Sequence, residues 1–391
     1  INVSAEKTPL PDDIQRLASE LASVERGLII CGPDTDSKLA ANVAALANRL
    51  GYPLLADCLS QVRCGPHDCG MVIDSYDAFI GDKEVTASLV PQVVLRFGAL
   101  PVSKPLTGYL EQHCSARHIL IDNAGWRDPF QLTSEIWHVD GASFCKDLIS
   151  ALKGERAGRK WSERWRNIAG TARNIISGKL AEMTGMFEGK IFTELSQLLP
   201  ENSLLFAGNS MPVRDMDTFF PSTGSPIRFM ANRGASGIDG VVSTALGVSA
   251  VSPGRLALVI GDISFYHDMN GLLAAKAFGL NATIIVINNN GGGIFSLLPQ
   301  ASYEDVFEPY FGTPHGLTFK ATAELYGLDY CLADNWTIFT EAVRKSLATA
   351  GTTLIEVPGD RQLNARLHKQ IRELVIKQIH QSEAGNGKNR S

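Results

Sequence analysis

The chain has 391 residues, of which 45% are hydrophobic and 20% charged, and its 36 Lys and Arg against 41 Asp and Glu give a formal net charge of −5. This composition excludes a disordered chain, a coiled coil and a collagen-like fibre, and it offers no general basic charge to nucleic acid. No apolar run approaches the ~18 residues that a membrane helix needs, so we expect no membrane insertion. At roughly 150 residues per domain, the length predicts two or three domains.

Cysteine usage indicates a reducing compartment, which we take to be the cytoplasm. The seven cysteines are an odd number spread thinly along the chain, unlike a disulfide framework. Cys64, His67 and Cys69 lie close enough in the sequence to suggest zinc. However, no second pair of ligands follows at zinc spacing, and the Gly-Pro between them is typical of a turn. We therefore favour a loop with buried thiols over a metal site.

Strands and helices alternate in the first part of the chain. Helical periodicity is predicted at residues 12–24 and 37–50, and short apolar strands at residues 27–32, 92–97, 118–122 and 136–139. Such alternation indicates a parallel α/β sheet. The turn after the first strand lacks the glycine pattern of a phosphate-binding loop, so we favour a plain strand-to-helix turn.

A polar, charged stretch at residues 153–160 divides the chain. Trp161 and Trp165 follow it on a helical pattern, which indicates an interdomain connection packed by its aromatic side chains. We predict one domain over residues 1–160 and a second over 161–391, with its own strand–helix alternation. The last ten residues are rich in Gly, Asn and Ser, and we expect residues 382–391 to form a frayed tail.

The most informative segment is a strand–helix–strand unit between residues 256 and 289. Apolar strands are predicted at residues 256–260 and 283–287, with a helical pattern at 264–278 between them. Asp262 follows the first strand and Asn289 follows the second. Parallel pairing would place both side chains at the carboxyl edge of the sheet, where open α/β sheets bind ligands.

Oxygen ligands at this edge favour a magnesium–diphosphate site. A carboxylate, an amide oxygen and the carbonyls of a glycine loop form a hard-oxygen set, with no Cys or His beside them. Backbone N–H groups of the glycine loops and of a helix beginning near Ser264 would contact the diphosphate. Two capped strand ends are the alternative, but a spacing of 27 from Asp262 to Asn289 with three glycines following is more specific.

Several motifs in chain order resemble one family. Gly261-Asp262 with Asn288-Asn289 is similar to the signature of thiamine-diphosphate-dependent enzymes. Residues 208–215 (GNSMPVRD), 232–240 (NRGASGIDG) and 288–299 (NNNGGGIFSLLP) resemble the 2-succinyl-5-enolpyruvyl-6-hydroxy-3-cyclohexene-1-carboxylate synthases of menaquinone biosynthesis. The resemblance covers the whole chain. It implies two doubly wound parallel-sheet α/β domains, a middle domain and a diphosphate-binding domain.

The resemblance also implies roles for residues within these motifs. Mg²⁺ or Mn²⁺ would be held by the side chains of Asp262 and Asn289 and by the carbonyl of Gly291, and Ile238 would bend the cofactor into a V shape. Ser264 would contact the diphosphate, with a helix cap as its competing role. The implied cofactor contacts are Ser236, Gly237, Ile238, Gly261, Asp262, Ser264, Asn289, Gly291 and Gly292. The implied substrate contacts are Lys104, Ser210, Arg214, Arg233, Ile294, Phe295 and Leu298.

The implied reaction decarboxylates 2-oxoglutarate on thiamine diphosphate and joins the product to isochorismate. Both substrates are dicarboxylates, and Arg pairs with carboxylates in a bidentate way, so Arg214 and Arg233 are the expected binders. Ser210 and Arg214 are four residues apart after a predicted strand, which would place them on one helical face. Ile294, Phe295 and Leu298 would form an apolar wall.

The family's N-terminal pyrimidine-binding domain has no counterpart that we recognise in this chain. In the family that domain supplies the Glu that activates the cofactor, so no catalytic residue is assignable here and we expect the chain alone to be inactive. In the family, the pyrimidine domain of one subunit faces the diphosphate domain of another. This arrangement implies a homodimer or tetramer.

Two other functions remain open from the sequence. Another thiamine-diphosphate-dependent decarboxylase or acetohydroxyacid-type synthase would share the cofactor motifs, although monocarboxylate substrates need fewer cations than Arg214 and Arg233 provide. A non-catalytic module that retains the diphosphate site is the second. A nicotinamide-binding domain is excluded because no predicted strand leads into the GxGxxG pattern.

Overall fold

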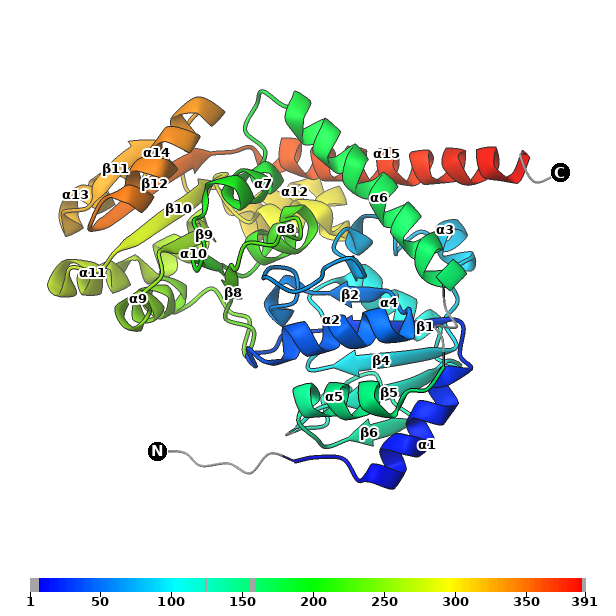
Figure 1. The fold of residues 1–391 in the computed structure, drawn as a ribbon. Coiled ribbons are helices and arrows are strands. Elements are labelled where there is room, and N and C mark those ends of the chain that lie inside the picture. Colours follow the sequence, from blue (N-terminus) through cyan, green and yellow to red (C-terminus); the bar gives the residue numbers. More distant parts are fainter. Residues whose placement is uncertain (1–6, 124, 155–158, 389–391) are drawn as a thin grey trace. The chain divides into compact units, whose positions relative to one another are not determined.

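A computed structural model describes residues 7–123, 125–154 and 159–388, and its chain divides into two compact units (Figure 1). Unit 1 contains the described residues of Ile1–Ile176, Pro221–Gly224 and Glu373–Ser391, and unit 2 contains Ser177–Phe220 and Ser225–Arg372. Two long helices, α6 (Arg159–Glu182) and α15 (Arg361–Lys388), contribute residues to both units. The predicted domain boundary after residue 160 falls at the start of α6 and stays a prediction.

Unit 1 is built on a six-stranded, all-parallel sheet in the order β3-β2-β1-β4-β5-β6. Its strands are β1 (Gly27–Cys31), β2 (Leu54–Ala56), β3 (Val72–Ile73), β4 (Val93–Phe97), β5 (Arg117–Ile121) and β6 (Glu135–Trp137). Its helices besides the long pair are α1 (Pro11–Ala22), α2 (Leu39–Leu50), α3 (Lys83–Ala87), α4 (Lys104–Gln112) and α5 (Gly141–Ala151). The strand order reverses between β1 and β4, so the sheet is doubly wound, as the sequence predicts.

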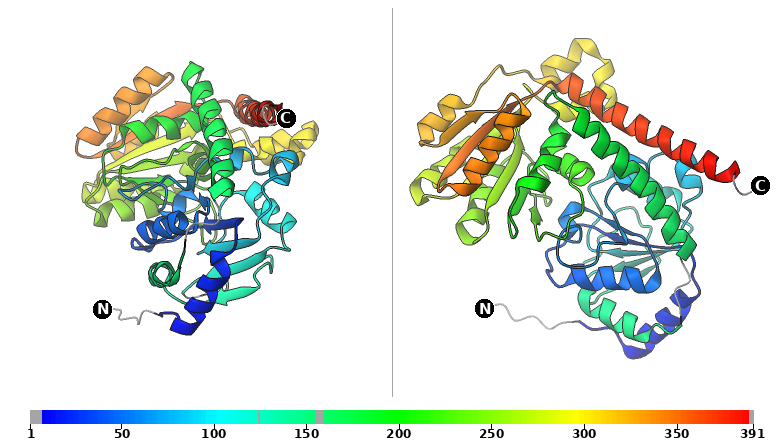
Figure 2. Two further views of the ribbon diagram at one scale, coloured as in Figure 1. Left: turned by 45° about the vertical axis from the view of Figure 1, so that its right-hand side comes forward. Right: turned by 45° about the horizontal axis from the view of Figure 1, so that its top comes forward.

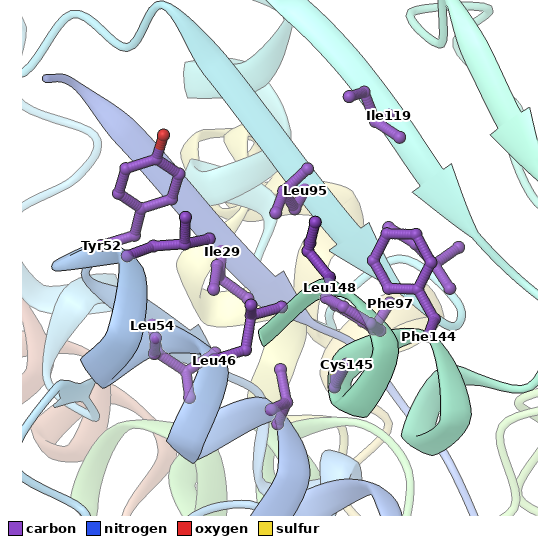
Figure 3. Close-up of a cluster of buried hydrophobic side chains, with 14 of the residues drawn as sticks. Ile29, Leu46, Tyr52, Leu54, Leu95, Phe97, Ile119, Phe144, Cys145 and Leu148 are labelled. Atoms are coloured by element: carbon purple, nitrogen blue, oxygen red, sulfur yellow. The ribbon is translucent and has the colours of Figure 1, made fainter. Parts of the chain in front are cut away.

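One face of this sheet carries the hydrophobic core shown in Figure 3. Alternate residues of β1 and β4, such as Ile29 and Leu95, point to this face because strand side chains alternate. Helices α1, α2 and α5 cover it, and Leu46 and Leu148 are completely buried there. Each fully buried side chain of this size stabilises the fold by about 1.5–3 kcal/mol.

The start of α6 buries an aromatic cluster, as the spacing of its Trp residues predicts. Trp165 is fully buried, and its ring centroid lies 6.1 Å from Phe79 and 6.2 Å from Tyr109. Trp161 packs edge-on against Trp165 at 6.0 Å, and its Nε1 donates to the carbonyl of Gly27 at 2.7 Å. The cluster therefore ties α6 to the first strand of the unit 1 sheet.

The predicted frayed tail is wrong over most of its length, because α15 continues to Lys388. Residues 389–391 lie outside the described residues. In unit 1 the end of α15 lies beside α6 (Figure 2), where Arg164 and Glu383 form an ion pair at 2.6 Å. Val375 and Ile379 are buried. This packing, which the composition of the last residues does not reveal, stabilises the helix.

Unit 2 is built on a second six-stranded, all-parallel sheet in the order β11-β12-β10-β9-β7-β8. Its strands are β7 (Leu204–Ala207), β8 (Arg228–Met230), β9 (Leu256–Gly261), β10 (Ala282–Asn288), β11 (Asp329–Leu332) and β12 (Thr352–Pro358). Its helices besides the long pair are α7 (Glu188–Leu198), α8 (Met211–Phe219), α9 (Val241–Val251), α10 (Asp262–Asp268), α11 (Leu272–Phe278), α12 (Glu304–Phe307), α13 (Lys320–Tyr326) and α14 (Trp336–Ala348). The chain passes from β8 across β7 to β9, so the winding direction reverses beside β7.

Helices cover both faces of the unit 2 sheet. Helices α9, α10, α11 and α13 bury one face, with Phe265 and Phe319 meeting edge-on at 5.0 Å. Helix α14 packs on β10 and β12, and α8 packs on β7 and β9. The expectation of a doubly wound α/β fold in both parts of the chain is confirmed. Within the described residues, no helix is both long and apolar enough to cross a membrane.

The helix predicted at residues 264–278 is in fact two helices, α10 and α11, separated by a 3₁₀ turn at Met269–Gly271. Asp268 turns its carboxylate to the start of α9, where it accepts from the Ser243 N–H at 2.7 Å and from the Ser243 hydroxyl at 2.9 Å. A Cβ at Gly271 would lie 2.5 Å from the Ser243 hydroxyl oxygen. The helical sequence pattern is continuous over residues 264–278, but close packing against α9 interrupts the helix.

We expect Trp165→Ala to destabilise unit 1. Replacing a fully buried Trp removes its apolar contacts and leaves a cavity, which costs about 3–5 kcal/mol. Urea unfolding followed by circular dichroism would show an earlier first transition. Trp126→Ala is the matched control because Trp126 is 73% exposed, and equal shifts for the two variants would contradict the packing role of Trp165.

Candidate functional site

A cavity of about 380 Å³ opens at the carboxyl ends of β7, β9 and β10 in unit 2. This edge lies beside the point where the winding of the sheet reverses, the usual ligand position in open α/β sheets. The lining residues come from the loops after β7, β8 and β10, from the ends of β9 and β10, and from α7, α8 and α10. They are Glu188, Asn209, Ser210, Met211, Pro212, Arg214, Arg233, Ser236, Ile238, Gly261, Asp262, Ile263, Ser264, Ile287, Asn289, Gly291, Gly292, Gly293, Ile294 and Phe295.

Asp262 and Asn289 meet at this edge, as the pairing of their strands predicts. The parallel register of β9 and β10 aligns Gly261 with Ile287. Asp262 is 1% and Asn289 7% exposed, so both polar side chains are withdrawn from bulk water. Asp262 accepts from the N–H of Gly291 at 3.0 Å, while the Oδ1 of Asn289 is buried without a hydrogen-bond partner among the described residues.

The glycine loop after β10 needs glycine because another segment approaches it closely. The N–H of Gly292 donates to the carbonyl of Gly312 at 2.8 Å. A Cβ at Gly291 would lie 1.9 Å from the same carbonyl oxygen, and Gly291 also has a φ of +137°, which L side chains rarely adopt. The carbonyl of Gly291 accepts from the N–H of Gly293 at 3.0 Å. The loop is therefore held in one shape beside Asp262.

A second segment, which the sequence analysis did not single out, secures this loop. The Oδ1 of Asn290 accepts from the N–H groups of His315 at 2.9 Å and Gly316 at 2.8 Å. The Nδ1 of His315 accepts from the N–H of Leu317 at 3.0 Å, which leaves its proton on Nε2 in the neutral ring. That Nε2 lies 3.1 Å from an oxygen of Asp262.

Asn209 joins the loops that carry the predicted substrate residues. Its Nδ2 donates to the carbonyls of Asn232 at 3.0 Å and Gly237 at 2.6 Å, and its Oδ1 accepts from Arg233 at 2.9 Å. Arg214 donates to the carbonyl of Ser210 at 2.6 Å. Asn209 belongs to the GNSMPVRD motif, but its position in the sequence does not by itself indicate this role.

The spacing of Ser210 and Arg214 predicted that both lie on one helix. In the structure, Ser210 lies just outside that helix. It directly precedes α8 and has a φ of +73°, a left-handed conformation that is uncommon for residues other than glycine. Both residues nevertheless line the cavity. Ser264 is the third residue of α10, in its first turn, and its hydroxyl donates to the carbonyl of Ile238 at 3.0 Å. The bond from Ser264 thus joins α10 to the loop that carries Ile238.

Most of the predicted site residues converge. The cavity lining includes Ser210, Arg214, Arg233, Ser236, Ile238, Gly261, Asp262, Ser264, Asn289, Gly291, Gly292, Ile294 and Phe295. Gly237 and Leu298 lie close in sequence to lining residues but outside the lining itself. Lys104 belongs to unit 1, where it is the first residue of α4. The roles assigned to all of these residues stay predictions.

A buried carboxyl group, Glu188, was not anticipated in the cavity wall. It is the first residue of α7 and accepts from the Nδ2 of Asn289 at 2.8 Å. Burial and the nearby charge of Asp215 raise its pKa to about 8, while the bond from Asn289 acts in the opposite direction. No motif around Glu188 signals this position, because its partners come from distant parts of the chain.

Asp215 and His368 form a buried ion pair behind this wall. The Nε2 of His368 lies 3.2 Å from Asp215, and its ring packs against Phe187 and Phe219. Burial by itself lowers the pKa of His368, but the carboxylate of Asp215 more than offsets this, so the pKa of His368 is raised. Unit 2 therefore buries two groups, Glu188 and His368, whose pKa values are both raised.

Two family descriptions match the chain. The description "Middle domain of thiamine pyrophosphate" matches residues 11–207, and "Thiamine pyrophosphate enzyme, C-terminal TPP binding domain" matches residues 212–357. The chain therefore belongs to the thiamine pyrophosphate enzymes, and unit 2 contains most of the region that corresponds to their cofactor-binding domain.

Two relatives indicate a narrower group within the thiamine pyrophosphate enzymes. They confirm the resemblance drawn from the motifs. A 2-succinyl-5-enolpyruvyl-6-hydroxy-3-cyclohexene-1-carboxylate synthase of Geobacillus thermodenitrificans is 49% identical over 378 residues, which cover 96% of this chain and 64% of that protein. A protein of the same name from Chloroflexus aurantiacus is 47% identical over 373 residues, covering 95% and 63%. The chain thus spans slightly less than two thirds of the length of these relatives.

A solved structure shares the fold at much lower identity. Benzoylformate decarboxylase from Polynucleobacter necessarius superimposes with a TM-score of 0.66 at 15% identity, covering 92% of this chain and 66% of that one. At this identity the likeness shows the fold alone.

The donor atoms in the cavity fit a divalent cation with a diphosphate. A buried acceptor without a partner costs about 1–3 kcal/mol, and cation ligation would remove that cost for the Oδ1 of Asn289. Asp262 supplies a carboxylate, and the adjoining loop supplies carbonyls and N–H groups, the oxygen-rich set that Mg²⁺ prefers. The side chains present therefore fit the cofactor of this family.

We expect the free energy of unfolding to fall as pH rises from about 6.5 to 8. The folded pKa values of His368 and Glu188 are both raised, so the folded state keeps protons that the unfolded chain has released, and this advantage disappears as pH passes the folded values. Asp215→Asn removes a charge that raises both pKa values. This substitution should therefore flatten the pH dependence of the free energy of unfolding. Urea unfolding at a series of pH values measures this effect.

His267→Gln is the control for that measurement, since His267 is an exposed histidine of the same unit. Its pH dependence should match that of the unchanged protein. If the free energy of unfolding of Asp215→Asn falls with pH as steeply as that of the unchanged protein, the buried pair does not govern the pH dependence.

Proposed function

We propose that this chain carries the cofactor and substrate site of a 2-succinyl-5-enolpyruvyl-6-hydroxy-3-cyclohexene-1-carboxylate synthase. The reaction decarboxylates 2-oxoglutarate and joins the product to isochorismate. The convergence of Asp262 and Asn289 with Arg214 and Arg233 on one cavity carries the proposal. Because the chain spans about 64% of its relative from Geobacillus thermodenitrificans, the activity is proposed for a protein of the relatives' full length.

The cation is proposed to be Mg²⁺ or Mn²⁺. Asp262 and the Oδ1 of Asn289 would hold it through their side chains, and Gly291 through its carbonyl, leaving positions for diphosphate oxygens. When bound, thiamine diphosphate supplies the electron sink for decarboxylation and carbon–carbon bond formation. The glycine loop positions N–H groups and carbonyls around this point, and Ser264 fixes the loop that carries Ile238.

Two arginines support dicarboxylate substrates. Arg214 is anchored by the carbonyl of Ser210 and Arg233 by the side chain of Asn209, so both guanidinium groups are held at the cavity wall with little freedom left to lose. Ile294 and Phe295 supply an apolar wall that would exclude water from the reacting carbon. Lys104 and Leu298 stay candidates for the same substrates.

A homodimer or tetramer is proposed for the complete enzyme. Exposed apolar side chains on adjacent helices of unit 2 support an interface there. Val251 on α9 is 84% exposed, and Leu273 and Phe278 on α11 are 61% and 76% exposed. No catalytic acid or base is assigned among the described residues, and in the resembled family the activating Glu comes from the pyrimidine-binding domain.

We expect Asp262→Ala to abolish cofactor binding. Loss of a direct cation ligand should raise the Kd for thiamine diphosphate with Mg²⁺ by at least the about 10- to 100-fold that changes next to metal ligands cost. Calorimetry on the chain measures this directly. Asp329→Ala is the control, because Asp329 is exposed at the start of β11. Equal binding by the Asp262 variant and the unchanged chain would remove Asp262 from the site.

We expect Arg233→Met to weaken the use of dicarboxylates without affecting the cofactor. Losing a charge-assisted bond costs about 1.5–3 kcal/mol, which corresponds to a rise of about 10- to 150-fold in the KM of the carboxylate substrate. Steady-state assays on the full-length enzyme with 2-oxoglutarate and isochorismate test this, and Arg228→Met, at an exposed position of β8, is the control.

The same assay separates the proposal from another thiamine-diphosphate-dependent decarboxylase. A monocarboxylate enzyme would turn over pyruvate in preference to 2-oxoglutarate with isochorismate. That preference would contradict the proposed substrates while leaving the cofactor site intact.

A further inference from the structure

Glu188 is the one ionisable residue among the described residues of the cavity wall that the proposed chemistry leaves without a task. It is 5% exposed and begins α7, far in sequence from the strands that carry the cation ligands. Its Oε1 accepts a hydrogen bond from the Nδ2 of Asn289 at 2.8 Å. This contact links a residue with no recognisable motif to one of the proposed cation ligands.

The orientation of the Asn289 carboxamide decides whether it can bind a cation. The two ends of an asparagine side chain are nearly equal in size, but only Oδ1 carries a lone pair for a cation, whereas Nδ2 carries two donor hydrogens. Some neighbour must therefore select between two orientations of similar shape. An acceptor next to one end selects the orientation that brings Nδ2 to that acceptor.

The surroundings of Asn289 leave Glu188 as the selecting neighbour. A Cβ at Gly359 would lie 3.2 Å from the Cβ of Asn289, and a Cβ at Gly293 would lie 2.8 Å from its Nδ2. These glycines let backbone approach the carboxamide without offering it a side chain. The Oδ1 then has no hydrogen-bond partner among the described residues, so the amide nitrogen is the only end with a polar side-chain contact.

We propose that Glu188 is a positioning residue that holds the Nδ2 of Asn289 and thereby turns its Oδ1 into the cavity as a cation ligand. The inference rests on the proposed function, in which Asn289 ligates the cation. A flipped carboxamide would lose the bond from Nδ2 to Glu188 and would direct N–H donors at the cation, which is unfavourable. The carbonyl oxygen of a neutral carboxyl or carboxamide also accepts a hydrogen bond, although less strongly than a carboxylate, so Gln can replace Glu in this role.

The first experiment compares Glu188→Leu with Glu188→Gln in the 391-residue chain. Calorimetry measures the Kd for thiamine diphosphate at saturating Mg²⁺. Losing the acceptor in the Leu variant should raise the Kd about 10- to 100-fold, the range for residues that orient metal ligands. The Gln variant should bind nearly as well as the unchanged chain. Weak binding by the Gln variant alongside good binding by the Leu variant would overturn the proposal.

A double-variant cycle distinguishes action through Asn289 from direct ligation. If Glu188 acts only by orienting Asn289, then Glu188→Leu combined with Asn289→Ala should bind no worse than Asn289→Ala alone. Additive losses would mean that Glu188 contacts the cation or cofactor itself, and the positioning role would be wrong.

A charge exchange tests the side-chain contact if the Leu variant does not fold. Asn289→Asp puts two carboxyl groups against each other and should weaken binding. Adding Glu188→Gln returns a donor to face the new carboxylate, and binding should recover. A general packing role for Glu188 predicts no such recovery, so its absence would count against the proposal.

Asp215→Asn is the matched control, because Asp215 is a buried carboxyl near Glu188 that lies outside the cavity lining and is an ion-pair partner of His368. Its Kd should be close to that of the unchanged chain, and thermal unfolding would verify the fold of each variant. An unchanged Kd in Asn289→Ala would remove Asn289 from the site and the proposed function with it. Weak binding by Asn289→Ala with normal binding by Glu188→Leu would reject the positioning role alone.

Discussion

The parallel pairing of β9 with β10 is the constraint on which the site depends. Its register aligns Gly261 with Ile287, so Asp262 and Asn289 leave the sheet at the same edge. Strand β7 pairs with the other side of β9 and brings Asn209 to that edge as well. Because side chains alternate along a strand, a slip of one residue would turn the wrong asparagine of the pair toward the cavity.

The side chains of two adjacent asparagines donate to two different buried glutamates. Asn289 donates to Glu188 at 2.8 Å, and Asn288 donates to Glu356 at 2.7 Å. Glu356 lies on β12 and also accepts from the N–H of Phe319 and the hydroxyl of Tyr330, each at 2.9 Å. Buried polar groups need such partners, because an unpaired one costs a large share of the total stability. The site is thus held by contacts that also stabilise unit 2.

Much of the fold follows from local pattern. Short apolar runs between helical stretches indicated parallel α/β sheets, and the strands β4, β9 and β10 begin and end within about one residue of prediction. The predictions of secondary structure were wrong where a segment distant in the sequence packs against the element. The break between α10 and α11 reflects the packing of Gly271 and Asp268 against Ser243 on α9. The end of α15 is helical because residues such as Ile379 pack within unit 1, although its composition is typical of a tail.

The chemistry proposed for the cavity could be predicted from residues next to one another in the chain. Gly-Asp and Asn-Asn after apolar strands, the triple glycine and two motif arginines predict a cation, a diphosphate and carboxylates, since each such residue type suits one kind of ligand. The tertiary structure alone revealed Glu188 and His315 beside Asn289 and Asp262. These contacts join residues 101 and 53 positions apart in the chain. Local sequence encodes propensity and chemistry, but which side chains meet across such distances is decided by the packing of the whole sheet.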